Sequence, residues 1–365
     1  MKSLVLTVAV LAVLWISPAW GQVGDPASPY GINVHSAGSA ASHAMIGTMM
    51  DAGVDWLRVD FHWFRVEPSQ DNFNWSYYDG LVNYLQSRSR PVNVFANVHV
   101  PPAWATQSGT VSNDRLNSTA DWVDVLTRAV QRYAGTIDYW GFYNEPVATW
   151  SGSSTDYINE IIKPGADAIH AASAAAKVAG PDLAHSPGWY DWMKDTIEQA
   201  GDKIDYLSHH TYGSSRSQLN DRLNASTTFG SNPTWWGLVE PSVREVLEYT
   251  GWSKDVWLTE TGWNTAPPPD GADQQYQADR LTDFFNDWFG DTPNVGDWLD
   301  KGFIYDMYDD PGISTKGLLE SDGTPKLGYQ AYADFIAANP VPEPATLVML
   351  ALGGLALVRR RAKNV

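Results

Sequence analysis

Segments of strand-type composition alternate with segments of helix-type composition along most of this chain, and the alternation limits the folds open to it. Strands are expected at residues 30–35, 54–61, 92–98, 137–145, 177–181, 204–211, 256–260 and 303–308. Helices are expected at residues 41–52, 77–89, 119–134, 156–176, 192–199, 239–250, 274–289 and 329–338. Because strands that alternate with helices form a parallel sheet with crossover helices, eight such units predict an α/β fold, a single (β/α)8 TIM barrel.

The middle of the chain is expected to be one domain, at residues 22–340. No Ser/Gly-rich linker interrupts residues 25–338, and a chain of 365 residues is long enough for one large barrel. Long loops are expected at Gly213–Pro233, after the sixth strand, and at Asn264–Asp273, after the seventh. Both would lie at the C-terminal face, where barrels place their sites.

The first 21 residues have the pattern of a secretory signal peptide. Lys2 gives a weak positive start, Leu4–Ile16 is apolar, and Ala19-Trp20-Gly21 puts small residues where a signal peptidase reads them. This pattern predicts a signal peptide at residues 1–21, cleaved by signal peptidase before Gln22. A membrane anchor is the alternative, but the apolar run is short for one.

The last residues carry a more specific pattern. Val341-Pro342-Glu343-Pro344 is followed by an apolar run, Ala345–Val358, and then by three arginines. Taken alone, the run could be a buried helix or a short membrane span with its arginines on the cytoplasmic side. The whole arrangement at residues 341–365 resembles the bacterial PEP-CTERM sorting signal.

That resemblance implies export across the inner membrane and recognition by an exosortase-type sorting enzyme. The tail would then be lost, so the chain would contact the membrane only transiently. The implied location is the periplasm, outer surface or extracellular matrix of a Gram-negative-type bacterium.

Charge and composition exclude several classes of function. The formal net charge is −18, a surface that repels nucleic acid and anionic membranes. The chain has no Cys, so neither a disulfide nor a thiolate nucleophile is available. The histidines form no His-X-X-X-His motif, and neither a metal nor another cofactor is expected. A Ser-His-Asp hydrolase is disfavoured, because no Gly-X-Ser-X-Gly elbow lies in a suitable context.

Two glutamates stand at the ends of predicted strands. Glu145 ends the fourth strand within Asn144-Glu145-Pro146, and Glu260 ends the seventh before a turn at Gly262. A barrel can bring two such carboxyls together across its mouth, as retaining glycosidases require. Aromatic neighbours of Glu145 predict a raised pKa for its carboxyl.

These two motifs resemble those of clan A glycoside hydrolases, which are retaining enzymes on a (β/α)8 barrel. Within the clan, the chain is most similar to glycoside hydrolase family 39 and its relatives, over about residues 30–336. Further resemblance is carried by Trp56–Phe61, Val66–Pro68, Tyr305–Asp310, Gly317–Leu319 and Lys326–Tyr332.

The resemblance implies roles for individual residues. Glu145 would be the acid/base and Glu260 the nucleophile. Asn144 would hydrogen-bond the sugar 2-OH. Arg58, at the end of the second strand, would keep Glu260 ionised, unless it forms a bridge to Asp60 or Glu67 instead.

Other substrate contacts are expected around this pair. His210-Thr211-Tyr212 resembles the clan's His-X-Tyr after the sixth strand, with Tyr212 contacting the nucleophile. His209 and His210 point to opposite sides of a strand, and His210 is the one expected to face the site. The remaining candidates, each with a packing role as the alternative, are His99, Trp104, Trp150, Trp236 and Trp263. Tyr305 stands where many clan members have a Trp.

The function expected from the sequence is therefore that of an exported retaining glycoside hydrolase. Its substrate would be a β-linked polysaccharide or oligosaccharide. Two alternatives remain open at this point. One is a non-catalytic carbohydrate-binding or matrix scaffold protein on a barrel, and the other is a matrix-remodelling transglycosylase.

Overall fold

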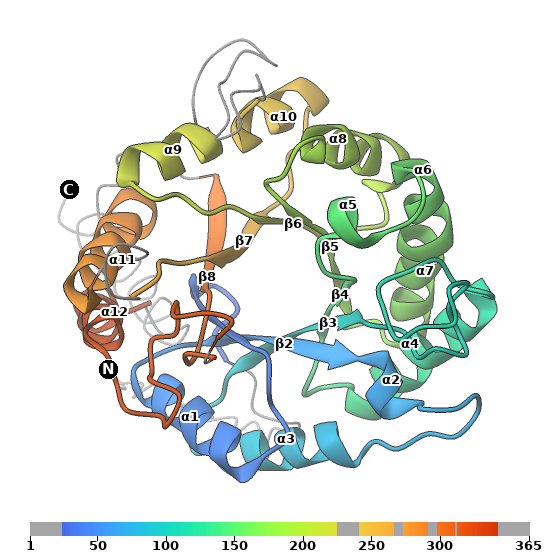
Figure 1. The fold of residues 1–365 in the computed structure, drawn as a ribbon, viewed down its shortest axis with the longest axis horizontal. Helices are drawn as coiled ribbons and strands as arrows, with labels where there is room; N and C mark the ends of the chain where they lie inside the picture. Colours follow the sequence, from blue (N-terminus) through green and yellow to red (C-terminus); the bar gives the residue numbers. More distant parts are fainter. Residues whose placement is uncertain (1–23, 225–240, 266–272, 291–297, 311, 342–365) are drawn as a thin grey trace, which may run out of the picture.

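A computed structural model describes residues 24–224, 241–265, 273–290, 298–310 and 312–341 of the chain. Eight parallel strands close into one barrel in sequence order, which confirms the predicted (β/α)8 fold. Figure 1 looks nearly along the barrel axis, with the strands at the centre and the helices around them. The strands are β1 Tyr30–Val34, β2 Trp56–His62, β3 Asn93–His99, β4 Tyr139–Phe142, β5 Lys177–Ala184, β6 Tyr206–His210, β7 Val256–Thr261 and β8 Leu299–Ile304.

The helices of the described residues form the outer layer and the short segments at the C-terminal face. Most follow a strand and cross back to the start of the next, as parallel pairing requires. They are α1 Ala40–Asp51, α2 Trp63–Val66, α3 Ser76–Ser87, α4 Thr119–Tyr133, α5 Pro146–Thr149, α6 Ser154–Tyr157, a π-helical turn Ile158–Ile162, α7 Lys163–Ala172, α8 Trp189–Ala200, α9 Arg216–Asn224, α10 Val243–Thr250, α11 Gln274–Phe289 and α12 Leu327–Ala338.

The barrel interior changes character along its axis. Toward the strand N-termini it is filled by an aromatic cluster that includes Trp56, Phe95, Trp257 and Phe303. Because side chains alternate along a strand, Arg58 follows Trp56 on the same face of β2, one layer nearer the C-terminal end. The aromatic layer therefore fills the barrel interior toward the N-terminal end of the strands, and charged residues such as Arg58 lie nearer the C-terminal end.

Several predicted boundaries were wrong where the backbone turns sharply. The fourth strand was expected to run to Glu145, but β4 ends at Phe142, because Tyr143 and Glu145 adopt left-handed conformations with φ of 53° and 51°. The fifth strand was expected to end at Pro181, yet β5 continues to Ala184. The eighth was expected at residues 303–308, and β8 lies earlier, at Leu299–Ile304.

Some predicted helices and loops also differ. The long helix expected at residues 156–176 is divided by the π-helical turn and ends at Ala172. Part of the loop expected at Gly213–Pro233 is helix α9. Pro241 precedes helix α10, because Ser242 caps that helix by accepting a hydrogen bond from the Glu245 amide.

The two terminal segments predicted as leader and sorting tail lie outside the described residues, apart from Val341, and so does Trp236. Within the part of the chain that the structure describes, every helix is too short or too polar to cross a bilayer.

Candidate active site

The two predicted catalytic glutamates lie together at the C-terminal face of the barrel. Glu260 is the penultimate residue of β7 and is 4% exposed, whereas Glu145 follows β4 and precedes helix α5. One carboxylate oxygen of each residue and one ring nitrogen of His210 lie within 4.8 Å of one another. Retaining glycosidases hold their carboxyls roughly 5 Å apart, and inverting enzymes roughly 6.5–9.5 Å apart. An upper limit of 4.8 Å between these oxygens lies nearer to the retaining spacing than to the inverting one.

Arg58 reaches from the barrel interior to both Glu260 and Asn144, the neighbour of Glu145. Its side chain is fully buried, and it lies third in β2 rather than at the strand's end. Nη1 donates to Glu260 Oε1 at 2.9 Å, and Nη2 donates to Asn144 Oδ1 at 2.6 Å. A buried guanidinium with fixed donors holds the groups that it binds in one orientation.

Tyr212 holds the other oxygen of the nucleophile candidate. Its hydroxyl donates to Glu260 Oε2 at 2.7 Å. Both carboxylate oxygens of Glu260 therefore accept a hydrogen bond, one from Arg58 and one from Tyr212. Two donors fix the orientation of the carboxylate.

His210 lies between carboxylates. Its Nδ1 is 3.0 Å from Glu145 Oε1, and its Nε2 is 3.3 Å from Asp182 Oδ1. Burial alone would lower the pKa of His210, but the charges of Glu260 and Asp182 and its hydrogen bonds raise the pKa to about 10. At neutral pH it is therefore an imidazolium. His209 points away, with its Nε2 3.3 Å from His185 Nδ1 and its ring against Trp189.

His210 predicts a pH dependence of stability. The pKa of His210 is near 6.5 in an unfolded chain and about 10 in the folded protein. Its contribution to the free energy of unfolding is therefore full below pH 6.5 and is lost as the pH rises through 10. The free-energy difference between the wild type and His210→Gln should therefore shrink from pH 6 to pH 10. Urea unfolding at both pH values measures it, with His170→Gln, at the surface, as the control. A constant difference would contradict the assignment.

Glu145 does not have the raised pKa expected from its sequence. Burial does raise the pKa of its carboxyl, but the hydrogen bond and charge of His210, together with Arg58, outweigh burial and lower it. Its side chain is still 32% exposed. The expectation considered aromatic neighbours and missed the cationic His210, which comes from β6.

Asp182 is the main residue that the sequence prediction missed. It is fully buried on β5, with a left-handed φ of 59° at a register shift. Its Oδ2 accepts from Arg58 at 2.6 Å and from Asn97 at 2.8 Å, and its Oδ1 accepts from Thr259 at 2.6 Å. A charged residue directly after Pro181, in an otherwise apolar run, was the available signal.

His99 and Tyr305 contact other residues at the C-terminal end of the barrel. His99 is buried on β3, with its Nε2 3.5 Å from Asp60 Oδ1. Tyr305 follows β8 and packs edge-on against both His35 and Tyr212. Tyr212 in turn donates a hydrogen bond to Glu260.

The tryptophans expected as sugar platforms are engaged in packing where they are described. Trp104 donates its indole N–H to the Glu67 carbonyl at 3.1 Å. Trp263 is 4% exposed and donates to the Gly213 carbonyl at 2.7 Å. Trp150 is buried against Tyr157. Trp150 and Trp263 are buried, whereas Trp104 is partly exposed.

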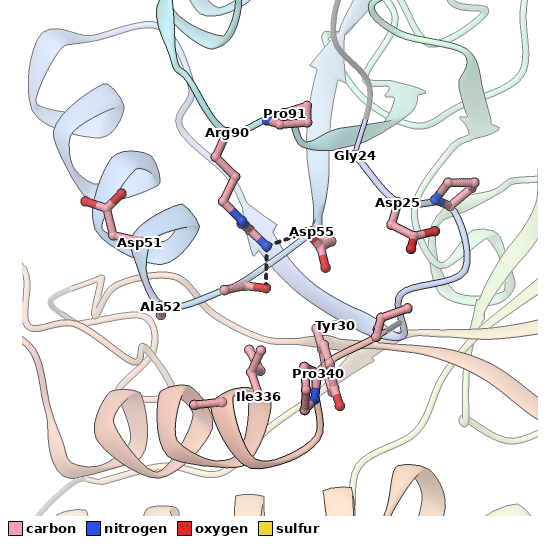
Figure 2. A pocket seen from close by; sticks show the side chains of 14 residues that line it. Gly24, Asp25, Tyr30, Asp51, Ala52, Asp55, Arg90, Pro91, Ile336 and Pro340 are labelled. Atoms are coloured by element: carbon pink, nitrogen blue, oxygen red, sulfur yellow. Dashed lines mark hydrogen bonds and ion pairs between the residues drawn. The ribbon is translucent and has the colours of Figure 1, made fainter. Parts of the chain in front are cut away.

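Figure 2 shows a pocket of about 540 Å³ at the other end of the barrel, where the strands begin. Arg90 points into it and donates to the carbonyls of Met50, Gly53 and Val54 and to the Asp55 carboxylate. Arg90 is therefore fully occupied in joining helix α1 to the start of β2. None of the predicted site residues lines this pocket.

Comparison with solved structures identifies the fold. The chain is similar to a family 39 glycoside hydrolase from Bacteroides cellulosilyticus WH2, with a TM-score of 0.61 and 19% identity over 84% of this chain and 63% of that one. It is also similar to a monomeric beta-xylosidase from Caulobacter crescentus CB15, with a TM-score of 0.59 and 17% identity over 85% and 68%. For a psychrophilic family 10 endo-beta-1,4-xylanase, the values are 0.57 and 15% over 84% and 96%.

Family models identify the chain at the level of sequence. Residues 20–281 match the model of the cellulase family, glycosyl hydrolase family 5, and residues 340–362 match the PEP-CTERM protein-sorting motif. The predicted clan and the predicted sorting signal are thereby confirmed. The chain therefore belongs to the cellulase family, glycosyl hydrolase family 5, within clan A, and it carries a C-terminal PEP-CTERM protein-sorting motif.

Proposed function

We propose that this enzyme cleaves the O-glycosidic bonds of a β-linked polysaccharide or oligosaccharide by double displacement. The observation that supports this proposal is the pair of carboxylates, Glu145 and Glu260, with oxygens within 4.8 Å. Structural neighbours are named as a beta-xylosidase, an endo-beta-1,4-xylanase and an exo-beta-1,4-mannosidase. β-1,4-linked xylan and mannan are therefore the first substrates to test, with β-glucan because of the family.

In the first step, a carboxylate oxygen of Glu260 attacks the anomeric carbon while the bond from that carbon to the leaving oxygen breaks. Glu145 donates its proton to that leaving oxygen, and a glycosyl ester forms on Glu260. In the second step, Glu145 takes a proton from water, the water oxygen attacks the anomeric carbon, and Glu260 leaves as a carboxylate.

Glu145 must carry a proton in the first step, although its pKa is lowered in the structure. Burial is the largest influence on this carboxyl, and it already opposes ionisation. A sugar that covers the exposed third of the side chain increases burial and thereby raises the pKa.

Asn144 is oriented for the role proposed for it. Its Oδ1 is occupied by Arg58 at 2.6 Å, so the amide N–H₂ group remains available as the donor. A sugar 2-OH near Glu260 can accept this hydrogen bond, which strengthens as the oxocarbenium ion forms.

The test combines a glycan panel with two measurements of mechanism. Product mass identifies the cleaved linkage, and NMR of the first product anomer should show retention. A 2-fluoro glycoside with an activated leaving group should label Glu260. An inverted product, or a label on another residue, would overturn the proposed roles. Products longer than the substrate would instead support the transglycosylase.

We further propose that signal peptidase removes residues 1–21 and that an exosortase-type enzyme removes the tail. The mature protein would then lie in the periplasm, at the outer surface or in the extracellular matrix. Intact mass of the protein from its native host tests both cleavages. A mass that retains the triple-arginine end would contradict removal of the tail.

Tyr212→Phe is expected to lower kcat about 10–100-fold with little change in Tm. A hydrogen bond to a charged group contributes about 1.5–3 kcal/mol, and Tyr212 donates one to Glu260 Oε2. Steady-state kinetics measures the loss. Tyr276→Phe is the matched control, because it removes a hydroxyl that donates to the Ser214 carbonyl instead. Equal losses in both variants would argue against a role for the Glu260 contact.

A further inference from the structure

Three side chains that sequence alone did not group lie together beside the catalytic pair. Asp60 and His62 are two residues apart on β2, so they project from the same face of the strand. His99 is the register partner of His62 on the neighbouring strand β3. One ligand atom from each of the three lies within 4.8 Å of the others.

His99 is the independent sign of a missing ligand. It is 6% exposed, and neither of its ring nitrogens has a hydrogen-bond partner within the described residues. A buried imidazole without a well-formed hydrogen bond costs free energy, and such groups are rare unless a ligand or water satisfies them. Its Nε2 faces Asp60 Oδ1 at 3.5 Å.

The distances suit a tetrahedral metal ion. Zn²⁺ binds imidazole nitrogen and carboxylate oxygen at about 2.0–2.2 Å, which places two ligands of one tetrahedron about 3.4 Å apart. The 3.5 Å between Asp60 Oδ1 and His99 Nε2 is nearly that separation. Asp60 is also oriented, because its other oxygen, Oδ2, lies 2.5 Å from His35 Nδ1. Hydrogen bonds from outside the ligand set commonly fix a metal-binding side chain in this way.

A second group with similar spacing is less suited to a cation. In Glu145, His210 and Glu260, both nitrogens of His210 already face carboxylates, and Arg58 binds Glu260. A metal ion there would have to displace these contacts and sit beside two cations. In the set formed by Asp60, His62 and His99, the two nitrogens of His99 have no hydrogen bond within the described residues.

We propose that Asp60, His62 and His99 form a binding site for a divalent transition-metal ion of the Zn²⁺ type. Two imidazoles and one carboxylate are ligands that suit zinc, copper and nickel, and three protein ligands leave a fourth position open. His62 is only half-buried, so the site opens toward the mouth of the barrel. Exposed Arg65, whose Nε lies 3.3 Å from His62 Nδ1, opposes the ion by its charge.

Occupancy of this site should inhibit the enzyme. A bound ion would occupy His99, so that His99 could no longer contact a sugar. Its ligand Asp60 contacts His35, and His35 packs against Tyr305. Tyr305 packs against Tyr212, which donates a hydrogen bond to Glu260. Sugar and metal would therefore compete for one region of the mouth. Inhibition rests on the proposed function, whereas metal binding can be measured without any substrate.

The experiment is calorimetric titration of the tag-free protein with ZnCl₂, supported by the visible spectrum of the Co²⁺ form. We expect one ion per chain and tetrahedral Co²⁺ bands. His62→Gln and Asp60→Asn should each weaken binding at least tenfold, and Arg65→Gln should strengthen it. Because Asp60 is buried and its variant can misfold, the half-buried His62 is the decisive position.

Two controls separate this site from others. Glu145→Gln alters the second carboxylate–histidine group, and His170→Gln alters a surface histidine that pairs with Asp205. Both should bind Zn²⁺ as the wild type does. Absence of saturable binding, binding that persists in His62→Gln, or binding that is lost in Glu145→Gln would each overturn the proposal.

Discussion

Glu260→Gln is expected to lower kcat/KM at least about 10³-fold on every substrate, because an amide cannot form the glycosyl ester. Glu145→Gln should behave differently on an aryl glycoside with an acidic phenol. That leaving group departs without a proton, so kcat/KM should change little. The second step still needs a base, so kcat should fall and the phenol should appear in a burst. On a natural glycan, both variants should be severely impaired.

Burst-phase kinetics on the aryl substrate and product analysis on the glycan measure these effects. Glu248→Gln, which removes an exposed glutamate paired with Arg244 on helix α10, is the matched control and should keep full activity. Near-normal turnover in Glu260→Gln would refute the mechanism. The opposite pattern, a burst in Glu260→Gln, would mean that the two roles are exchanged.

Sequence periodicity predicted the part of this site that lies along single strands. Glu260 is followed by a turn, and His210 differs from His209 by the alternation of side chains along β6. Such local rules need no knowledge of distant contacts. They were sufficient for the eight strands and the closed barrel. The roles expected of Arg58, Asn144 and Tyr212 came from the family resemblance instead.

Residues whose role depends on contacts between strands were not predictable in this way. Asp182 receives hydrogen bonds from β2, β3 and β7, and its own position is set by a register shift between β5 and β6. The pairing of His62 with His99 likewise follows from the β2–β3 register. A register is the alignment of one strand against another, so it cannot be predicted from the sequence of one strand alone.

The charge balance of the site shows the same limit. Arg58 and His210 are two buried cations, and their partners are Asp182, Glu145 and Glu260. The pKa of Glu145 depends on the whole group, because His210 lowers it and Asp182 raises it. A prediction from its neighbours in sequence therefore had the wrong sign.

Asp182→Asn is expected to be the most destabilising conservative change in this group. The carboxylate accepts hydrogen bonds from Arg58, Asn97 and Thr259, so an amide N–H₂ group in its place must face donors. Removing one partner of a buried ion pair costs about 3–5 kcal/mol. Loss of this charge should also lower the pKa of His210, which Asp182 helps to raise.

The pH dependence gives Asp182→Asn a sharper test than stability alone. Arg58 and His210 outweigh the effect of burial and hold the pKa of Asp182 far below its unfolded value of about 3.9. The contribution of the Asp182 charge to the free energy of unfolding is therefore present above pH 4 and is lost as the pH falls below that value.

The difference in free energy of unfolding between wild type and variant should be largest at pH 7 and should shrink toward pH 3. Asp205→Asn, which changes a partly exposed aspartate beside His170 and Lys177, should cost less than about 1 kcal/mol. If Asp182→Asn costs no more than Asp205→Asn, or if its cost is the same at pH 3 and pH 7, Asp182 is not the charge that holds Arg58 and His210 at the site.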